Sequence, residues 1–275
     1  MNLLASVSDF LATPGGIAAF VIFDVVVFIA IAALNYRWLF KRAFDVLFSG
    51  ILLAALSPFF AAFLIAAAVS GRAAGEGSAL FEREEFAGKG GRIARSYVFV
   101  TERTEEGERQ TTAVGRILRG CGMKYYPRLA AVFLGGLSFV GPRPMALEDA
   151  EALSPEERAR FAVRPGLVSS LERYGGEKLT YPGMLEEDAE YAAHYSLAKD
   201  ISFVLVRLGR LARGDGARPY GECTEEGYLA WLVRTGAVSE EEAEKIRARA
   251  AERASGEVRA RQEMRDYDEM RDRLL

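Results

Sequence analysis

The chain of 275 residues contains very little cysteine or histidine. Its two cysteines, Cys121 and Cys223, exclude a disulfide-braced scaffold and fit a domain in a reducing compartment. Neither has a metal-ligand partner at a usable spacing. The single histidine, His194, cannot form a metal cage and has no serine or cysteine nucleophile motif beside it. We therefore expect no metal site from these residues and place His194 on a helix surface.

A large excess of one charge is also missing. The chain has 35 lysine and arginine residues against 38 aspartate and glutamate residues, for a formal net charge of -3. Basic residues cluster at positions 37–42, 83–128 and 158–173, but acidic residues are interspersed among them. The sequence therefore lacks the basic surface of a nucleic-acid-binding protein, and we expect no nucleic-acid partner.

Half of the residues are apolar, and they crowd into the first seventy positions. The first apolar run, Gly15 to Leu34, has about the twenty residues that a bilayer-spanning helix needs. Arg37, Lys41 and Arg42 follow it and nothing basic precedes it, so the positive-inside rule places its far end in the cytoplasm. The pattern favours a retained transmembrane helix over a cleaved signal peptide, which has a basic start and a small-residue cleavage site.

Asp24 lies near the middle of this run, where a charge is costly. Two interpretations stay open for it. The carboxyl group is either protonated and tolerated, or turned toward another helix.

The second apolar run, Phe44 to Val69, is also long enough to cross a bilayer. Ser57 and Pro58 interrupt it near its centre. Proline removes a backbone donor and kinks a helix, and the serine hydroxyl can satisfy the freed carbonyl. These residues favour a re-entrant helix with both ends on the cytoplasmic face, and a kinked helix that crosses the bilayer is the alternative.

Short segments punctuated by glycine begin after Gly71. Ala79–Phe81 and Ser96–Thr101 are predicted to be strands of a hairpin-like unit on either side of the turn at Gly88–Gly91. A charged tail, Ser239–Leu275, is predicted to be a helix that lies on another part of the protein. Further helices are predicted at Thr112–Arg119, Pro127–Leu134, from Ser154-Pro155 to a point before Arg164, Met184–Ser196 and Ala198–Leu211.

Several short motifs occur in a distinctive order after the proline-broken run. They are Lys41 to Asp45, Ser57-Pro58, Val114 to Arg119, Pro127 to Leu129, Leu137 to Pro144, Arg164 to Gly166 and Asp188 to Asp200. In order and spacing, positions 39–214 resemble the bacterial sugar transferases, the monotopic polyprenyl-phosphate phosphoglycosyltransferases.

The resemblance implies an α+β membrane-anchored protein of the bacterial inner membrane, with its soluble domain on the cytoplasmic face. We expect a transmembrane helix and flank at 1–38 and a re-entrant membrane helix at 39–72. A small sugar-transferase-like α/β domain rich in amphipathic helices is expected at 73–216, and a charged helical extension at 217–275.

The resemblance also implies a reaction, the transfer of a phosphosugar from a UDP-sugar to undecaprenyl phosphate. In that family an aspartate attacks the sugar-linked phosphorus, UMP leaves, and the lipid phosphate resolves the covalent intermediate. The adjacent glutamate helps to hold Mg²⁺, which prefers oxygen ligands.

The chain departs from the family where this chemistry should lie. Alignment on Pro127 places Lys124 at the aspartate and Tyr125 at the glutamate, so neither catalytic position is intact. An ammonium group cannot replace a carboxylate nucleophile, and a neutral phenol lacks the charge of a metal ligand. Val98 and Val100 likewise occupy the positions of two cations in the family's Lys-Phe-Arg strand.

Three arginines remain candidates for binding phosphate: Arg119, Arg143 and Arg164. The planar guanidinium group suits phosphate, although these side chains could instead pair with nearby acids. Lys124 is a candidate replacement cation. Five carboxylates elsewhere are expected on solvated charged surfaces, three of them in a loop after the first strand: Glu82, Glu84, Glu85, Glu148 and Asp149.

Three functions follow. The favoured one is a catalytically degenerate member of glycan assembly that partners an active sugar transferase or another assembly protein, with no cofactor expected. An active transferase with a shifted nucleophile would need Mg²⁺. A third reading is a module that binds UDP-sugar or polyprenyl phosphate. Membrane lipid is a partner in each case.

Overall fold

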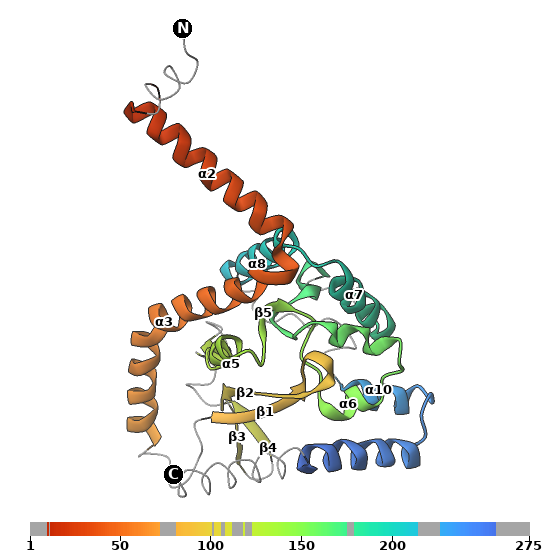
Figure 1. The fold of residues 1–275 in the computed structure, drawn as a ribbon. Helices are drawn as coiled ribbons and strands as arrows, with labels where there is room; N and C mark the ends of the chain where they lie inside the picture. The colour runs from red at the N-terminus through yellow and green to blue at the C-terminus, as the bar shows by residue number, and fades with distance from the viewer. Residues whose placement is uncertain are drawn as a thin grey trace, which may run out of the picture.

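A computed structural model describes residues 10, 12–71, 81–100, 102–105, 108–111, 118, 123–174, 179–213 and 226–256. These residues form a membrane-anchored α+β fold, in which two long N-terminal helices precede a domain of helices and small sheets. Figure 1 shows α2 projecting away from the domain and α3 running along its side. Cys121, Cys223, Arg119 and most of the predicted Thr112–Arg119 helix lie outside the described residues.

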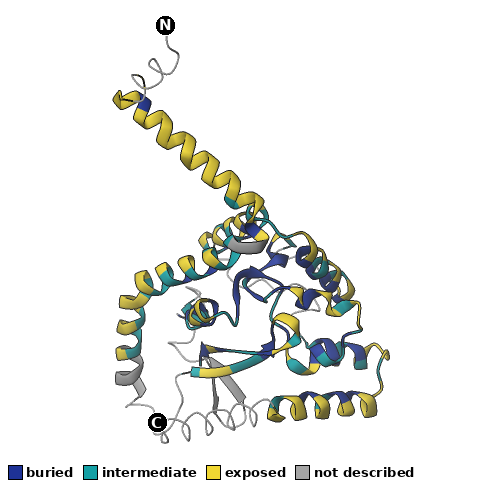
Figure 2. Cartoon of the chain, viewed as in Figure 1, coloured by how far each residue is buried: buried dark blue, intermediate teal, exposed yellow. Residues whose placement is uncertain are grey.

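Helix α2, Pro14–Leu34, confirms the first predicted apolar helix. Thr13 caps it, since its Oγ1 accepts from the Gly16 nitrogen at 3.0 Å, and Pro14 begins the first turn. Apart from Gly16, its residues lie mostly exposed, as Figure 2 shows. By length and composition α2 can cross a membrane, and so can positions 41–65 of α3. A short π-helix, Tyr36–Phe40, joins the two.

Helix α3, Lys41–Gly71, is continuous through Pro58 and bends around the side of the domain (Figure 1). Pro58 cannot donate to the carbonyl of Ala54, and the Ser57 hydroxyl donates to it instead, at 2.8 Å. This contact confirms the predicted role of the serine. Both halves of α3 touch the domain, because Asp45 accepts from the Phe139 nitrogen at 2.8 Å while the rings of Phe60 and Phe99 lie 5.5 Å apart.

A hairpin follows, with antiparallel strands β1, Phe81–Ala87, and β2, Ile93–Phe99. The predicted hairpin is right, but its strands were placed too far from the turn. Gly90 and Gly91 adopt positive φ angles of 67° and 72°, so the reversal is tight and the strands extend almost to it. A second hairpin, β3 (Glu102–Glu105) with β4 (Glu108–Thr111), was not predicted. Strands β5, Ser138–Gly141, and β6, Gly166–Ser169, pair in parallel.

Most of the predicted helices within the described ranges are present. They are α5 (Arg128–Leu134), α7 (Tyr181–His194), α8 (Leu197–Ala212) and a helix at 240–256 within the charged tail. The structure also has two further short helices, α6 (Leu147–Glu151) and α10 (Tyr228–Arg234). Short 3₁₀ turns lie at Met123–Tyr125 and Ser170–Tyr174.

The helix predicted from Ser154 is instead a 3₁₀ helix, Glu157–Ala162. Its predicted start is right, because the Ser154 nitrogen donates to Glu157 Oε2 at 2.7 Å and Ser154 Oγ accepts from the Glu157 nitrogen at 3.3 Å. The chain must be extended before Pro165 to enter β6, so only a short, tight helix fits.

Two large clusters and one small one form the core. One joins α5, the first hairpin, β5, β6 and α8, with the apolar face of α3 against it. Another joins α6, α7 and α10. Leu229 of α10 also packs on Ala243 and Ile246 of the helix at 240–256. This part of the tail therefore lies on the domain, as predicted.

Candidate functional site

The first motif, Lys41 to Asp45, binds the start of α3 to the domain through hydrogen bonds. Asp45 is 1% exposed and accepts from the Phe139 nitrogen at 2.8 Å and from Ser138 Oγ at 2.9 Å. Arg42 donates to the carbonyl of Val132, at the end of α5, at 2.7 Å. These contacts satisfy buried polar groups, so the motif has a structural role.

Lys41 makes a further contact between α3 and the domain. Its Nζ lies 2.5 Å from Asp200 of α8, and Asp200 also accepts from the hydroxyls of Tyr36 at 2.6 Å and Tyr191 at 2.7 Å. Burial raises the pKa of the Tyr191 hydroxyl, and the charge of Asp200 raises it further, so the phenol stays a donor. The network joins α8 to the segment between the two apolar helices.

The two proline motifs lie side by side through β5 and β6. A Cβ atom at Gly166 would overlap the backbone nitrogen of Gly141, so this close approach requires glycine. The Gly166 nitrogen donates to the carbonyl of Pro142 at 2.8 Å, and the Ser138 nitrogen donates to that of Pro165 at 2.9 Å. The motifs thereby fix the backbone around Arg143.

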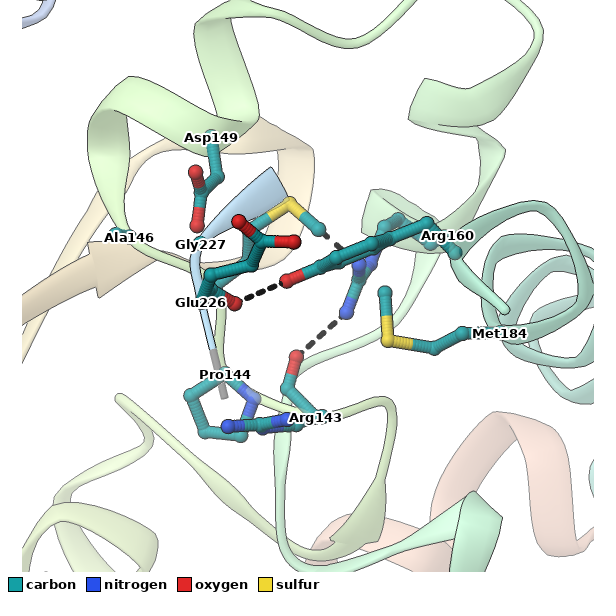
Figure 3. A pocket seen from close by; sticks show the side chains of 10 residues that line it. Arg143, Pro144, Ala146, Asp149, Arg160, Met184, Glu226 and Gly227 are labelled. Atoms are coloured by element: carbon teal, nitrogen blue, oxygen red, sulfur yellow. Dashed lines mark hydrogen bonds between the residues drawn. The ribbon is translucent and has the colours of Figure 1, made fainter. Parts of the chain in front are cut away.

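Arg143 lines a pocket of about 340 Å³ (Figure 3). Its carbonyl accepts from Nη2 of Arg160 at 2.6 Å, and the same nitrogen lies 2.9 Å from Asp188 Oδ2. Arg160 and Asp188 are 2% and 0% exposed, so a fully buried ion pair supports the pocket wall. Residues of the C-terminal segment, Glu226 and Gly227, complete the pocket.

Asp149 joins this pocket to α10. We expected it on a solvated surface together with Glu148. Glu148 is exposed, but Asp149 is buried and its Oδ1 accepts from the Leu229 nitrogen at 2.9 Å, at the start of α10. Burial raises the pKa of the Asp149 carboxyl, and backbone donors from Leu229 and Tyr228 oppose the shift. The prediction for Asp149 was wrong because its partner comes from the C-terminal segment.

Of the other candidate arginines, Arg164 lies away from the Arg143 pocket, and Arg119 lies outside the described residues. Arg164 Nε donates to the carbonyl of Gly135, just after α5, at 2.9 Å. Arg164 is not one of the residues that line the pocket. His194 lies on the exposed surface of α7 as expected, with Nδ1 3.0 Å from Glu190 Oε2.

Lys124 and Tyr125 lie in the 3₁₀ turn immediately before α5. The Lys124 ammonium lies 5.6 Å from the centre of the Tyr125 ring, and the Arg128 guanidinium lies 4.6 Å from it. Arg128 also lies 2.6 Å from Glu84 Oε2. Two cations therefore flank the aromatic ring, in an arrangement typical of cation–π contacts.

Glu84 was expected in a loop but lies within β1, as do Glu82 and Glu85. Glu84 is bound by Arg128, whose Nε and Nη2 both donate to its Oε2, at 3.0 and 2.6 Å. Glu85 is bound by Arg95, and this hydrogen bond is the largest cause that lowers the pKa of the Glu85 carboxyl. Of the three glutamates in β1, only Glu82 has the exposed position that we expected.

The available donors do not form a magnesium site at Lys124 and Tyr125. Mg²⁺ prefers several oxygen ligands, but the turn supplies an ammonium and a phenol, and Glu84 is already held by Arg128. Across the described ranges there is no group of three or more histidine, cysteine or acidic residues that could hold a metal ion. Val98, which the resemblance aligns with a cation of the family, is 1% exposed within β2.

A family model described as bacterial sugar transferase matches residues 36–213. A UDP-glucose:undecaprenyl-phosphate glucose-1-phosphate transferase of Caulobacter vibrioides is 32% identical over 195 residues, covering 64% of this chain and 71% of the relative. The exopolysaccharide production protein PSS of Rhizobium leguminosarum bv. phaseoli is 30% identical over 201 residues, with 64% and 97% covered. With the family's motifs joined in one domain, the chain belongs to the bacterial sugar transferase family.

Proposed function

We propose that this protein acts in bacterial glycan assembly as a catalytically degenerate family member and partners an active phosphoglycosyltransferase. The observation that carries the proposal is the Lys124–Tyr125–Arg128 arrangement, in which two cations flank an aromatic ring. The resemblance aligns Lys124 and Tyr125 with the family's acidic pair. The relatives with undecaprenyl-phosphate in their names support the substrate class of the active partner.

The arrangement opposes the family's chemistry in two ways. A carboxylate nucleophile is replaced by an ammonium group, which has no lone pair to attack phosphorus while it is charged. The nearby carboxylate of Glu84 accepts two hydrogen bonds from Arg128, which reduces its nucleophilicity. An active enzyme with a shifted nucleophile is therefore the weaker alternative.

Release of UMP tests the proposal. The full-length protein in lipid, given labelled UDP-sugars, undecaprenyl phosphate and Mg²⁺, should release no more UMP than a blank without protein. The Caulobacter relative, assayed in the same lipid, is the positive control. UMP release by wild-type protein that is lost in Glu84→Gln, but not in Glu82→Gln, would establish a shifted nucleophile and overturn the proposal.

The partnership needs its own measurement. Crosslinking in native membranes should yield a complex with a family member that retains the Asp-Glu pair. A protein found consistently without such a companion would contradict this part of the proposal.

We also infer that the domain lies at the cytoplasmic face with α3 re-entrant. Both halves of α3 contact the domain, which supports a return to the same face. On α8, three exposed apolar side chains at helical spacing form a stripe suited to the lipid interface: Ile201, Leu205 and Leu208.

The Arg143 pocket favours a second candidate function, the binding of UDP-sugar without turnover. Its volume suits a small ligand, and the guanidinium group suits a phosphate. Calorimetry should then show saturable binding that weakens about tenfold or more in Arg143→Ala. Arg164→Ala is the matched control, since Arg164 does not line the pocket. Equal affinities in the two variants would exclude this function.

A further inference from the structure

The centre of α2 carries a polar group that its own chain does not satisfy within the described residues. Asp24 has residues 14–23 before it and 25–34 after it in α2, ten on each side. It is the one ionisable side chain between Pro14 and Leu34. Since a 21-residue helix is about as long as the hydrocarbon core is thick, Asp24 lies near the middle of the bilayer when α2 crosses it.

The domain does not reach Asp24. Figures 1 and 2 show α2 leaving the domain as a single exposed helix, while α3 turns along the domain's side. The rings of Phe28 and Phe40, 5.9 Å apart, make a contact between α2 and the segment after it, one turn beyond Asp24. Within the described residues, Asp24 has neither a hydrogen bond nor an ion pair. A carboxyl group in this position is costly unless another polar group meets it at the same depth.

A second copy of the chain carries a matching group. Two copies inserted in the same direction present their Asp24 side chains at the same depth, and a two-fold axis between parallel helices lets them face each other. A carboxyl group that holds a proton has one donor and one acceptor, so a facing pair can form two hydrogen bonds. A different protein would need a polar group of its own at this level.

The side chains around Asp24 can form such an interface. At 3.6 residues per turn, Ile17 and Ile31 lie two turns away on the same face, and they are 54% and 49% exposed. Ile22 and Ile29 lie on the opposite face. We propose that α2 pairs in the membrane with α2 of a second copy through the face that carries Asp24.

Cysteine crosslinking in native membranes tests this pairing with the full-length protein. Both native cysteines are replaced by serine, and a single cysteine is introduced by Ile17→Cys, Ile31→Cys, Ile22→Cys or Ile29→Cys. Mild oxidation should give disulfide-linked dimers from the first two variants and not from the last two. Absence of dimers, equal dimers from both faces, or crosslinks only to another protein would overturn the proposal.

Substitution of Asp24 separates polar pairing from simple apolar contact. Asp24→Leu should reduce the dimer yield of the Ile31→Cys protein about tenfold, because the hydrogen bonds are lost. Asp24→Asn should retain dimers, because an amide also donates and accepts. Equal insertion of all variants in the membrane is the control. An unchanged dimer yield in Asp24→Leu would contradict the role of the carboxyl group, whatever the outcome of the UMP assay.

Discussion

Single polar residues connect parts of this protein that are distant in sequence. Asp149 links the family-matched region to α10, beyond the matched residues, through the Leu229 nitrogen. Glu84 links the first hairpin, through Arg128, to the start of α5, next to the turn that carries Lys124 and Tyr125. In both cases, a buried or partly buried carboxylate is held by a specific donor.

The first prediction concerns the pH dependence that Asp149 imparts to the docking of α10. Burial raises its pKa in the folded state above the ordinary value of about 3.9, so the folded protein binds this proton more tightly than the unfolded chain does. Its contribution to stability is complete below the unfolded pKa and is lost as the pH rises through the folded pKa. We expect Asp149→Asn to remove this dependence and keep the hydrogen bond from the Leu229 nitrogen.

Trp231 of α10 provides the signal in a Trp38→Phe background. Denaturant unfolding followed by its fluorescence should show the wild-type midpoint falling more than that of Asp149→Asn as the pH rises from about 4, the ordinary pKa of an aspartate. Asp149→Ala should be less stable by about 1 kcal/mol across this range, because the hydrogen bond from the Leu229 nitrogen is lost. Parallel pH profiles for wild type and Asp149→Asn would contradict the prediction.

Partners distant in sequence explain what sequence reasoning missed. The serine beside Pro58 was interpreted correctly, because its partner Ala54 lies within the same helical turn. The burial of Asp149 was not predicted, because its partner Leu229 is eighty positions away. Arg128 is likewise distant from Glu84 in sequence, and the packing of α5 against the first hairpin brings them together.

At the scale of elements, strong helical patterns predicted the positions of helices better than those of strands. Apolar spacing placed α8 to within one residue at each end. Strand β1 carries four consecutive charged side chains, whose partners include Arg95 across the hairpin and Arg128 of α5, so its pattern gave weak boundaries. The family resemblance located the candidate site, but the contacts of its residues required the structure.

The second prediction concerns the bend of α3. In proteins with a single engineered cysteine, Arg37→Cys and Gly71→Cys should react with a membrane-impermeant maleimide from the same side. Phe10→Cys, before α2, should react from the opposite side. Pro58→Leu restores a backbone donor and favours a straight helix, so position 71 should become less reactive from the first side. Reaction of positions 37 and 71 from opposite sides in the unmodified helix would establish a spanning α3.

At the scale of the whole molecule, the described C-terminal segment, residues 226–256, packs against the family-matched domain. Tyr181 of α7 donates to the carbonyl of Glu226 at 2.5 Å, and Arg253 of the last described helix donates to the carbonyl of Gly91 at 2.5 Å. These contacts connect opposite ends of the segment to α7 and to the turn of the first hairpin. The extension therefore supports the pocket wall at Glu226 and Gly227.

The third prediction tests this support. Ala243 is 0% exposed against Leu229, so Ala243→Asp should bury an unpaired charge and undock the helix at 240–256. Limited proteolysis should then cleave within 240–256 while α7 and α8 remain protected. Glu244→Asp, on the exposed side of the same helix, is the control. Equal resistance of both variants would show that the helix does not depend on this packing.

The close approach of Gly141 and Gly166 has a consequence for genome interpretation. A side chain at Gly166 would overlap the Gly141 backbone, so this contact requires glycine whether or not a sugar is transferred. A gene found by these motifs therefore reports an architecture and not a reaction.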